Sequence, residues 1–215
     1  MNERNIYART LMQLILISCI SVPAISQSFH GGMLLGLTTS QVDGDSYAGY
    51  NKAGIQGGVF VNTVFGTHTG ALLEIKYANR GARKPVSSGD PEVYVLNLHY
   101  IDLPVMFNLI LWERFIMEAG LVPGYLFAAA GEDSGGRLSK DQLAGFHKFD
   151  LGSLLGLRLK INDRLSFSAR YSYSLLSIRD IDTAGAYYSW FGNLFGYRKG
   201  DYNNYLSFGL YYEIR

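Results

Sequence analysis

Apolar and polar residues alternate strictly from Leu165 to Leu175, where each odd position is apolar or aromatic and each even position is Ser or Arg. A period of two places successive side chains on opposite faces of a β-strand. Further runs alternate in the same way, the first of them least clearly. The eight runs cover about residues 30–40, 53–65, 70–80, 93–109, 114–127, 146–161, 164–177 and 203–214. The pattern predicts an all-β fold.

The connections between these runs alternate in length. Short ones occur at "FGTHTG", "LWER" and "NDR", and long ones at "QVDGDSYAGYNK", "GARKPVSSGDPE", "AGEDSGGRLSKDQLAG" and "RDIDTAGAYYSWFGNLFGYRKGDYNN". Short turns on one rim, long loops on the other and an even strand number are typical of outer-membrane barrels. We therefore expect an eight-stranded antiparallel up-and-down transmembrane β-barrel with short periplasmic turns and long extracellular loops.

Charged residues gather on one face of each clear strand. Glu74 and Lys76, for example, lie opposite Leu73 and Ile75. The charged face is also rich in Gly, Ser and Ala, which suits the narrow interior of an eight-stranded barrel. Only 17% of all residues are charged, whereas a solvent-facing surface carries about 25 to 35%. The polar face is therefore predicted to point inward and the apolar face toward lipid.

This assignment gives an interior whose charges nearly cancel. The inward acids are Glu74, Asp102, Glu118, Asp150 and Glu213, and the inward bases are Lys76, Arg158, Lys160 and Arg170. Glu74, Glu118, Arg158 and Arg170 each lie about four to six residues from a short turn, so they should form one layer across the lumen. Glu118 and Arg170 are expected to couple, and the barrel is expected not to conduct ions freely.

Pairing can be predicted for one hairpin, because facing residues of an antiparallel pair share a side. Ile161 opposite Leu165 leaves a three-residue turn at 162–164, a common hairpin length. Within 93–109 the apolar residues change from even to odd positions after Tyr100, which predicts a β-bulge in this strand. Pro104 would sit near that bulge, while Pro123 lacks a comparable explanation.

Residues 1–26 read as a cleaved signal peptide. Arg4 and Arg9 lie in a short basic region before an apolar run that is too short to span a bilayer. Cleavage after Ser26 would follow the small-residue segment "AIS". A lipobox-like "LISC" offers an alternative in which Cys19 is acylated. The remaining residues 27–215 form one predicted barrel domain without a linker.

Composition and motifs point away from several site classes. A net charge of +1 argues against a nucleic-acid partner, and no later segment has the apolar length of a transmembrane helix. "EDSGG" and "DGDSYAGYN" lack the partners of a protease or EF-hand site, and the histidines are scattered. We therefore expect no catalytic residues, no cofactor and no metal. An aromatic-rich final loop, 187–197, could bind a sugar or peptide, pack on itself or lie in the lipid headgroup region.

Several stretches resemble the PorT-type outer-membrane β-barrel proteins of Bacteroidota. These are "GGMLLGLTTSQVDGDSYAGYNKAGIQGGVFV", "YIDLPVMFNL" and the Gly-containing final strand "YLSFGLYYEIR". The final strand also resembles a barrel-assembly signal in its polar, Gly, aromatic and hydrophobic positions, which are Ser207, Gly209, Tyr212 and Ile214. The resemblance implies an eight-stranded outer-membrane barrel, and links some members to protein secretion.

Three functional classes remain at this stage. The favoured one is a small outer-membrane barrel with a side-chain-filled lumen and a structural, anchoring or interaction role, of which the sharper version, implied by the resemblance, is an accessory of a secretion apparatus. The alternatives are an outer-membrane lipid-modifying enzyme and a secreted lipocalin-like carrier. Expected partners are outer-membrane lipid, the barrel-assembly machinery during insertion, and another protein of the cell envelope.

Overall fold

The computed structural model describes residues 29–45, 47, 49–85, 92–180 and 200–214. The long strands are β1 (Phe29–Asp43), β2 (Lys52–Val64), β3 (Thr69–Lys84), β4 (Tyr94–Asp102), β5 (Val105–Ile110), β6 (Phe115–Asp133), β8 (Phe149–Lys160), β9 (Leu165–Ser174) and β11 (Gly200–Ile214). Two-residue strands, β7 (Gly136–Arg137) and β10 (Arg179–Asp180), and a short helix, α2 (Lys140–Ala144), lie in the longer connections. The predicted signal peptide, Cys19 and the aromatic cluster at 187–197 lie outside the described residues.

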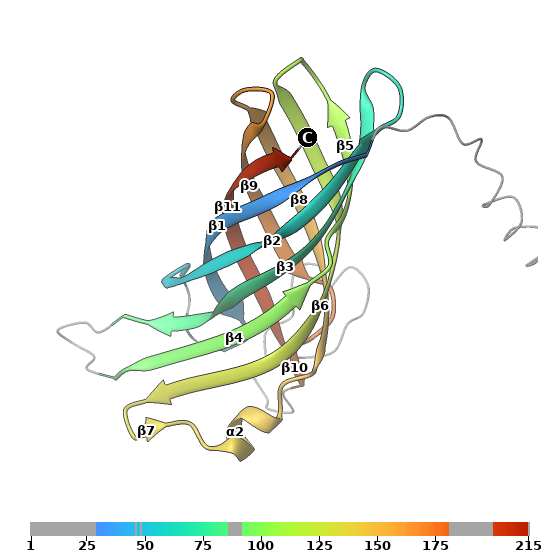
Figure 1. The fold of residues 1–215 in the computed structure, drawn as a ribbon. Coiled ribbons are helices and arrows are strands. Elements are labelled where there is room, and N and C mark those ends of the chain that lie inside the picture. Colours follow the sequence, from blue (N-terminus) through green and yellow to red (C-terminus); the bar gives the residue numbers. More distant parts are fainter. Residues whose placement is uncertain (1–28, 46, 48, 86–91, 181–199, 215) are drawn as a thin grey trace, which may run out of the picture.

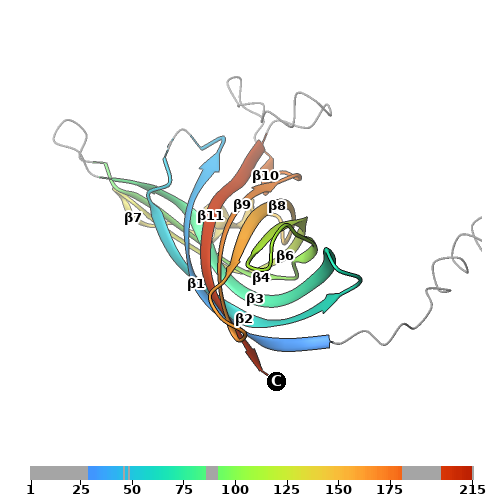
Figure 2. The same ribbon diagram turned by 90° about the horizontal axis from the view of Figure 1, so that it is seen from above.

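The strands form a closed antiparallel ring (Figures 1 and 2). Each long strand pairs with its neighbours in the chain, β4 and β5 together occupying one position, and β11 pairs with β1 over thirteen residue pairs from Gly31–Ile214 to Asp43–Tyr202. Closure leaves no free edge over most of the ring, as membrane-spanning sheets require. The predicted eight-stranded up-and-down barrel is thus confirmed.

The two rims differ as the loop lengths predicted. Figure 1 shows the turns between β2 and β3, β5 and β6, and β8 and β9 at the same end as the carboxyl end of β11. We call this end the short-turn rim. The opposite end, the long-loop rim, carries β7, β10 and α2. Among the described residues, no helix is long and apolar enough to cross a membrane.

The β8–β9 hairpin has the predicted register. Leu159 pairs with Phe167, and Leu157 pairs with Ala169. The Ile161 N–H donates to the Leu165 carbonyl at 2.9 Å, which closes the three-residue turn at 162–164. Asn162 stabilises this turn, because its side-chain oxygen accepts hydrogen bonds from the backbone N–H groups of Arg164 and of Leu165, the first residue of β9.

The outer face of the barrel is apolar. Leu35 and Phe149 are each 72% exposed in the isolated chain, and large apolar side chains surround the ring at the same outward parity. Apart from strand ends at the long-loop rim, the outward positions of the long strands carry no Asp, Glu, Lys or Arg within the described residues. Such a surface suits lipid contact. It is the opposite of the polar exterior and apolar cavity expected of a lipocalin-like carrier.

The strand formed by β4 and β5 keeps one phase, so the bulge predicted within it was placed wrongly. Leu96, Leu98 and Tyr100 point into the barrel and are at most 1% exposed. Sequence reasoning assigned them to lipid because they are apolar. They face inward because the lumen at this level is itself partly apolar, which an alternation pattern cannot reveal.

The irregularity lies in the neighbouring strand β6. His99 pairs with Ala128, but the next residue, Tyr100, pairs with Leu126. Phe127 is therefore the extra residue of a β-bulge, and it remains half-exposed on the outer face. The bulge changes the inward parity of β6 beyond this point.

Both strand prolines lie where the ladder is interrupted. Leu103 and Pro104 separate β4 from β5, and the register places Leu103 opposite Pro123. The Leu103 N–H donates to the Pro123 carbonyl at 2.8 Å, and the Glu74 N–H donates to the Pro104 carbonyl at 3.0 Å. The carbonyl of each proline thus accepts a hydrogen bond from the neighbouring strand, and only the hydrogen bond from the missing proline N–H is lost. A closed barrel can therefore accommodate both prolines.

Candidate functional site: the charged lumen

Arg170 on β9 joins two carboxylates, one on β6 and one on β3, the strand that lies across the ring from β9. Its Nε donates to Glu118 Oε2 on β6 at 2.6 Å, and its Nη1 donates to Glu74 Oε1 on β3 at 2.8 Å. Arg158 on β8 bonds the other oxygen of Glu118. All four side chains are at most 4% exposed. The structure therefore brings together Glu74, Glu118, Arg158 and Arg170, the four residues expected to form one layer.

Two further side chains complete this group. Lys76 Nζ lies 3.3 Å from Glu74 Oε2, and the Tyr211 hydroxyl donates to Glu74 Oε1 at 2.8 Å. The guanidinium groups of Arg158 and Arg170 also lie over the Tyr211 ring, at 4.8 and 5.0 Å from the ring centroid. We call Glu74, Lys76, Glu118, Arg158 and Arg170 the Glu118 layer.

Small residues leave the space that this layer fills. Gly156 lies between Glu118 and Arg170 in the strand register. A Cβ at Gly156 would lie 2.5 Å from Cγ of Arg170, so a larger residue would displace the arginine. Ser168 and Ser172 flank Arg170 on the same face and are almost fully buried. The alternation of large charged and small residues thus packs a narrow lumen.

A second charged layer, which we call the Arg80 layer, lies closer to the long-loop rim. Arg80 Nη1 donates to Asp102 Oδ2 at 2.7 Å, and its Nη2 donates to Asp150 Oδ2 at 3.2 Å. The guanidinium stacks 3.8 Å from the centroid of Tyr100. Both acids were predicted to point inward but Arg80 was not, although Arg80 shares the even parity of Glu74 and Lys76 on the same strand. That parity was the available signal.

Apolar side chains fill the lumen beyond the Arg80 layer. Residues from four of the barrel strands meet two residues of the long connections in one buried cluster. The cluster consists of Val42, Ala82, Leu96, Leu98, Tyr100, Leu126, Phe146 and Ile178. Because Phe146 and Ile178 come from the segments next to α2 and β10, the described parts of these connections contribute to the apolar filling of the lumen near the long-loop rim.

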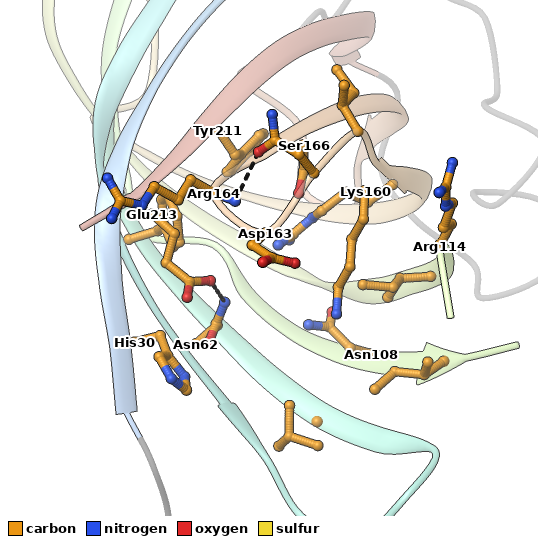
Figure 3. A pocket seen from close by; sticks show the side chains of 18 of the residues that line it. His30, Asn62, Asn108, Arg114, Lys160, Asp163, Arg164, Ser166, Tyr211 and Glu213 are labelled. Atoms are coloured by element: carbon orange, nitrogen blue, oxygen red, sulfur yellow. Dashed lines mark hydrogen bonds between the residues drawn. The ribbon is translucent and has the colours of Figure 1, made fainter. Parts of the chain in front are cut away.

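The short-turn rim, in contrast, holds a cavity of about 470 Å³, which we call the vestibule (Figure 3). Arg158 and Tyr211 line its inner end, next to the Glu118 layer. Figure 3 shows Glu213, His30 and Asn62 on one side, and Lys160, Asn108 and Arg114 on the other. Lys160 and Glu213, two of the predicted inward charges, therefore lie at the mouth rather than inside either layer.

The predicted assembly-signal residues are divided between the two faces of β11. Ser207 is 1% exposed and faces the lumen, and Gly209 pairs with Gly36 across the β1–β11 closure. Tyr212 and Ile214 are 45% and 54% exposed on the lipid-facing side. In the described part of the chain, no group of three or more His, Cys, Asp or Glu residues is arranged to hold a metal ion.

Asp45 is expected to make the attachment of the first long loop depend on pH. The pKa of its carboxyl is raised to about 7, chiefly by burial; the Tyr47 N–H and Arg179 oppose this rise, while Asp201 and Asp43 contribute to it. A raised pKa favours the folded loop in its protonated form, so this contribution is complete below about pH 4 and is lost as the pH rises through about 7.

The measurement is the hydrogen-exchange protection factor of the Tyr47 amide between about pH 5 and 8, a range that includes the raised pKa of Asp45. We expect protection to fall with rising pH in the parent and to stay level in Asp45→Asn. Equal pH profiles for the two proteins would contradict the assignment of this dependence to Asp45.

Comparisons with known proteins agree with the geometry. A crystal structure of Ail, the attachment invasion locus protein of Yersinia pestis, in complex with the heparin analogue sucrose octasulfate, superposes with a TM-score of 0.51 at 15% identity, covering 87% of this chain and 99% of that one. A crystal structure of Ail alone gives 0.50 at 15% identity, over 86% and 98%. Neisserial surface protein A gives 0.46 at 11% identity, over 87% and 99%.

At these identities the likeness concerns the fold alone. No curated protein sequence matches the chain. Residues 25–180, more than half of the sequence, match the profile of a family described as the outer membrane protein beta-barrel domain. Together with the closed ring and its apolar outer face, this match shows that the chain belongs to the outer membrane protein beta-barrel domain family.

Proposed function

We propose that this protein is a small outer-membrane barrel with a filled lumen, which acts by anchoring or interaction rather than by conducting solutes or by catalysis. The observation that carries the proposal is the buried network of the Glu118 layer, in which Arg170 spans the lumen between Glu118 and Glu74. The Arg80 layer and the apolar cluster beyond it add two further barriers along the same axis.

The charge balance of the two layers supports this proposal. They contain four acids, Glu74, Asp102, Glu118 and Asp150, and four bases, Lys76, Arg80, Arg158 and Arg170. A selective ion pathway favours one sign of charge, whereas here the signs cancel and the groups bond to one another. Opening a path would separate buried ion pairs, which is costly.

Planar-bilayer recordings test the proposal. We expect the purified, folded parent to produce no stable conductance steps, because the ion pairs hold the lumen closed. A variant in which Arg80, Glu118 and Arg170 are all replaced by Ala serves as the comparison, and we expect it to conduct if it inserts. Heat-modified migration on gels verifies that each sample is folded. Stable open channels in the parent would overturn the proposal.

The finer assignments rest on sequence motifs. The "GYNKAG" and "YIDLPV" stretches support placement among PorT-type proteins, and that resemblance supports a role as an accessory of a secretion apparatus. We include in the proposal a signal peptide at 1–26, cleaved on export, and insertion by the barrel-assembly machinery through the final strand. Proximity labelling from the short-turn rim should then enrich secretion components, and a label confined to lipid-metabolism proteins would remove the secretion role.

A further inference from the structure

The vestibule at the short-turn rim is built differently from the rest of the lumen. Its volume of about 470 Å³ lies within the range of small-ligand sites, roughly 300 to 1,000 Å³. Its outer lining includes the exposed turn residues Arg114, Asp163 and Arg164, so it opens to solvent at this rim. Its inner end meets the buried Glu118 layer, so a ligand would enter and leave through the same mouth.

Three cations line the mouth without a charge partner. Within the part of the chain that the structure describes, Arg114, Lys160 and Arg164 take part in no ion pair, whereas the deeper Arg158 is bound to Glu118. The Lys160 N–H donates to the Arg114 carbonyl at 2.8 Å, which places these two cations on adjoining strand ends. The lining also contains three acids: Asp163 and Glu213 are engaged in interactions of their own, and Glu113 takes part in no ion pair within the described residues. Three cations without an ion pair therefore face one such acid at the mouth.

Deeper in the vestibule lie buried polar groups that lack hydrogen-bond partners. Asn108 is 5% exposed and Thr63 is 8% exposed, and neither Asn108 Oδ1 nor Thr63 Oγ1 is bonded within the described structure. Both residues line the cavity. A buried acceptor or hydroxyl without a partner costs roughly 1 to 3 kcal/mol. A ligand with amide groups could offset this cost.

The inner wall also offers apolar surface. Phe60 and Ile116 line the cavity and are 4% and 5% exposed, and the ring of Tyr211 packs against Phe60 with centroids 5.3 Å apart. Cations at the mouth, unbonded amide and hydroxyl groups along the wall, and apolar side chains at the inner end are the features that an extended acidic peptide with an apolar side chain would match.

We propose that the vestibule binds an acidic peptide segment of a partner protein, which enters from the short-turn rim. A lipid headgroup fits less well, because Arg158 and Lys160 have the inward parity of β8 while Leu157 and Leu159 face lipid. An anion at the membrane surface would have to cross the barrel wall to reach them. This inference rests on the interaction role proposed above and names the face and chemistry of that interaction.

Fluorescence anisotropy with the folded protein in detergent tests the proposal. The probe is a labelled hexapeptide of alternating Glu and Leu, and the matched probe alternates Lys and Leu. We expect the acidic probe alone to bind, and Arg114→Glu with Lys160→Glu to weaken binding by about tenfold or more, equivalent to ~1.4 kcal/mol. The control Arg137→Glu, at the long-loop rim and 90% exposed, should bind as the parent does.

Salt and competition separate this site from a general attraction to charge. Binding should weaken with added NaCl, because the Debye length falls from about 10 Å at 0.1 M to about 3 Å at 1 M. Inorganic phosphate at matched ionic strength should not displace the peptide completely. Equal binding of both probes, equal loss in Arg137→Glu, full displacement by phosphate, or binding only to anionic vesicles would each overturn the proposal. A parent that binds no peptide and forms no channel would overturn it while leaving the filled lumen intact.

Discussion

Replacing Arg170 by Met is expected to lower the free energy of unfolding from detergent or lipid by about 3 to 5 kcal/mol, the usual cost of removing one partner of a buried ion pair. Arg170 bonds Glu118 and Glu74, and all three side chains are at most 1% exposed. Met fills a similar volume without charge, so the loss reports mainly the two carboxylates left without their shared partner. Denaturant titration followed by gel migration measures it.

The matched control is Lys160→Met, because Lys160 lies on the neighbouring strand at the exposed vestibule mouth. Exposed charges contribute only about 0 to 1 kcal/mol, so this variant should unfold nearly as the parent does. Comparable destabilisation by the two substitutions would show that loss of a cation in general, rather than the buried network, governs stability.

A double-mutant cycle measures the coupling between Glu118 and Arg170. Glu118→Gln and Arg170→Met together should destabilise the barrel less than the sum of the single changes, because each removes the interaction that the other has already lost. Strict additivity would contradict the direct 2.6 Å contact as a source of stability.

The charge swap Glu118→Arg with Arg170→Glu has a more limited expected recovery. It should be less harmful than the sum of its single changes, yet it should not restore the parent's stability. The structure supplies the reason: Arg158 is bonded to Glu118 and Glu74 is bonded to Arg170, so the swap places like charges next to each other. A fully restored double swap would mean that these two flanking contacts contribute little.

Strand number, rim asymmetry and the β8–β9 register could be predicted because each depends on local pattern. Alternation identifies strands, connection lengths identify the rims, and the three-residue turn at 162–164 fixes which residues face each other. The Glu118 layer followed from the same logic, since Glu118 and Arg170 share a parity and a distance from short turns. Their actual contacts could not be derived, because rotamers across a lumen depend on every neighbour.

The fourth strand shows where a polarity pattern fails. Alternation identifies two faces but assigns them to lipid or lumen only by composition, and Leu96, Leu98 and Tyr100 made the inner face look lipid-facing. The lumen beyond the Arg80 layer is apolar, so the usual contrast disappears there. The bulge at Phe127 was equally hidden, because a run of alanines after it has no clear alternation.

Arg80 illustrates a different difficulty. It is the last residue of the predicted 70–80 run and is followed by Gly81, Ala82, Arg83 and Lys84, so alternation alone does not show that the strand continues beyond it. In the structure β3 continues to Lys84, and Arg80 lies fully inside the lumen at 1% exposure. Strand length, rather than side-chain chemistry, decided which of these cations is buried.

Arg80→Met is therefore expected to be as destabilising as Arg170→Met, at about 3 to 5 kcal/mol. Arg80 forms ion pairs with both Asp102 and Asp150, and its guanidinium also lies over the rings of Tyr100 and Tyr205, at 3.8 and 4.8 Å from their centroids. Removing it would leave two carboxylates in a lumen layer closed on the long-loop side by apolar side chains.

Two comparisons isolate the cause in the same unfolding assay. Arg83→Met, three residues along β3 at an exposed position, should change stability by less than about 1 kcal/mol. Adding Asp102→Asn and Asp150→Asn to Arg80→Met should recover part of the loss, because neutral amides remove the two unpaired charges while keeping the size of the side chains. If the triple variant recovers no stability relative to Arg80→Met, the loss comes from the missing packing of the guanidinium against Tyr100 and Tyr205 rather than from the two unpaired carboxylates.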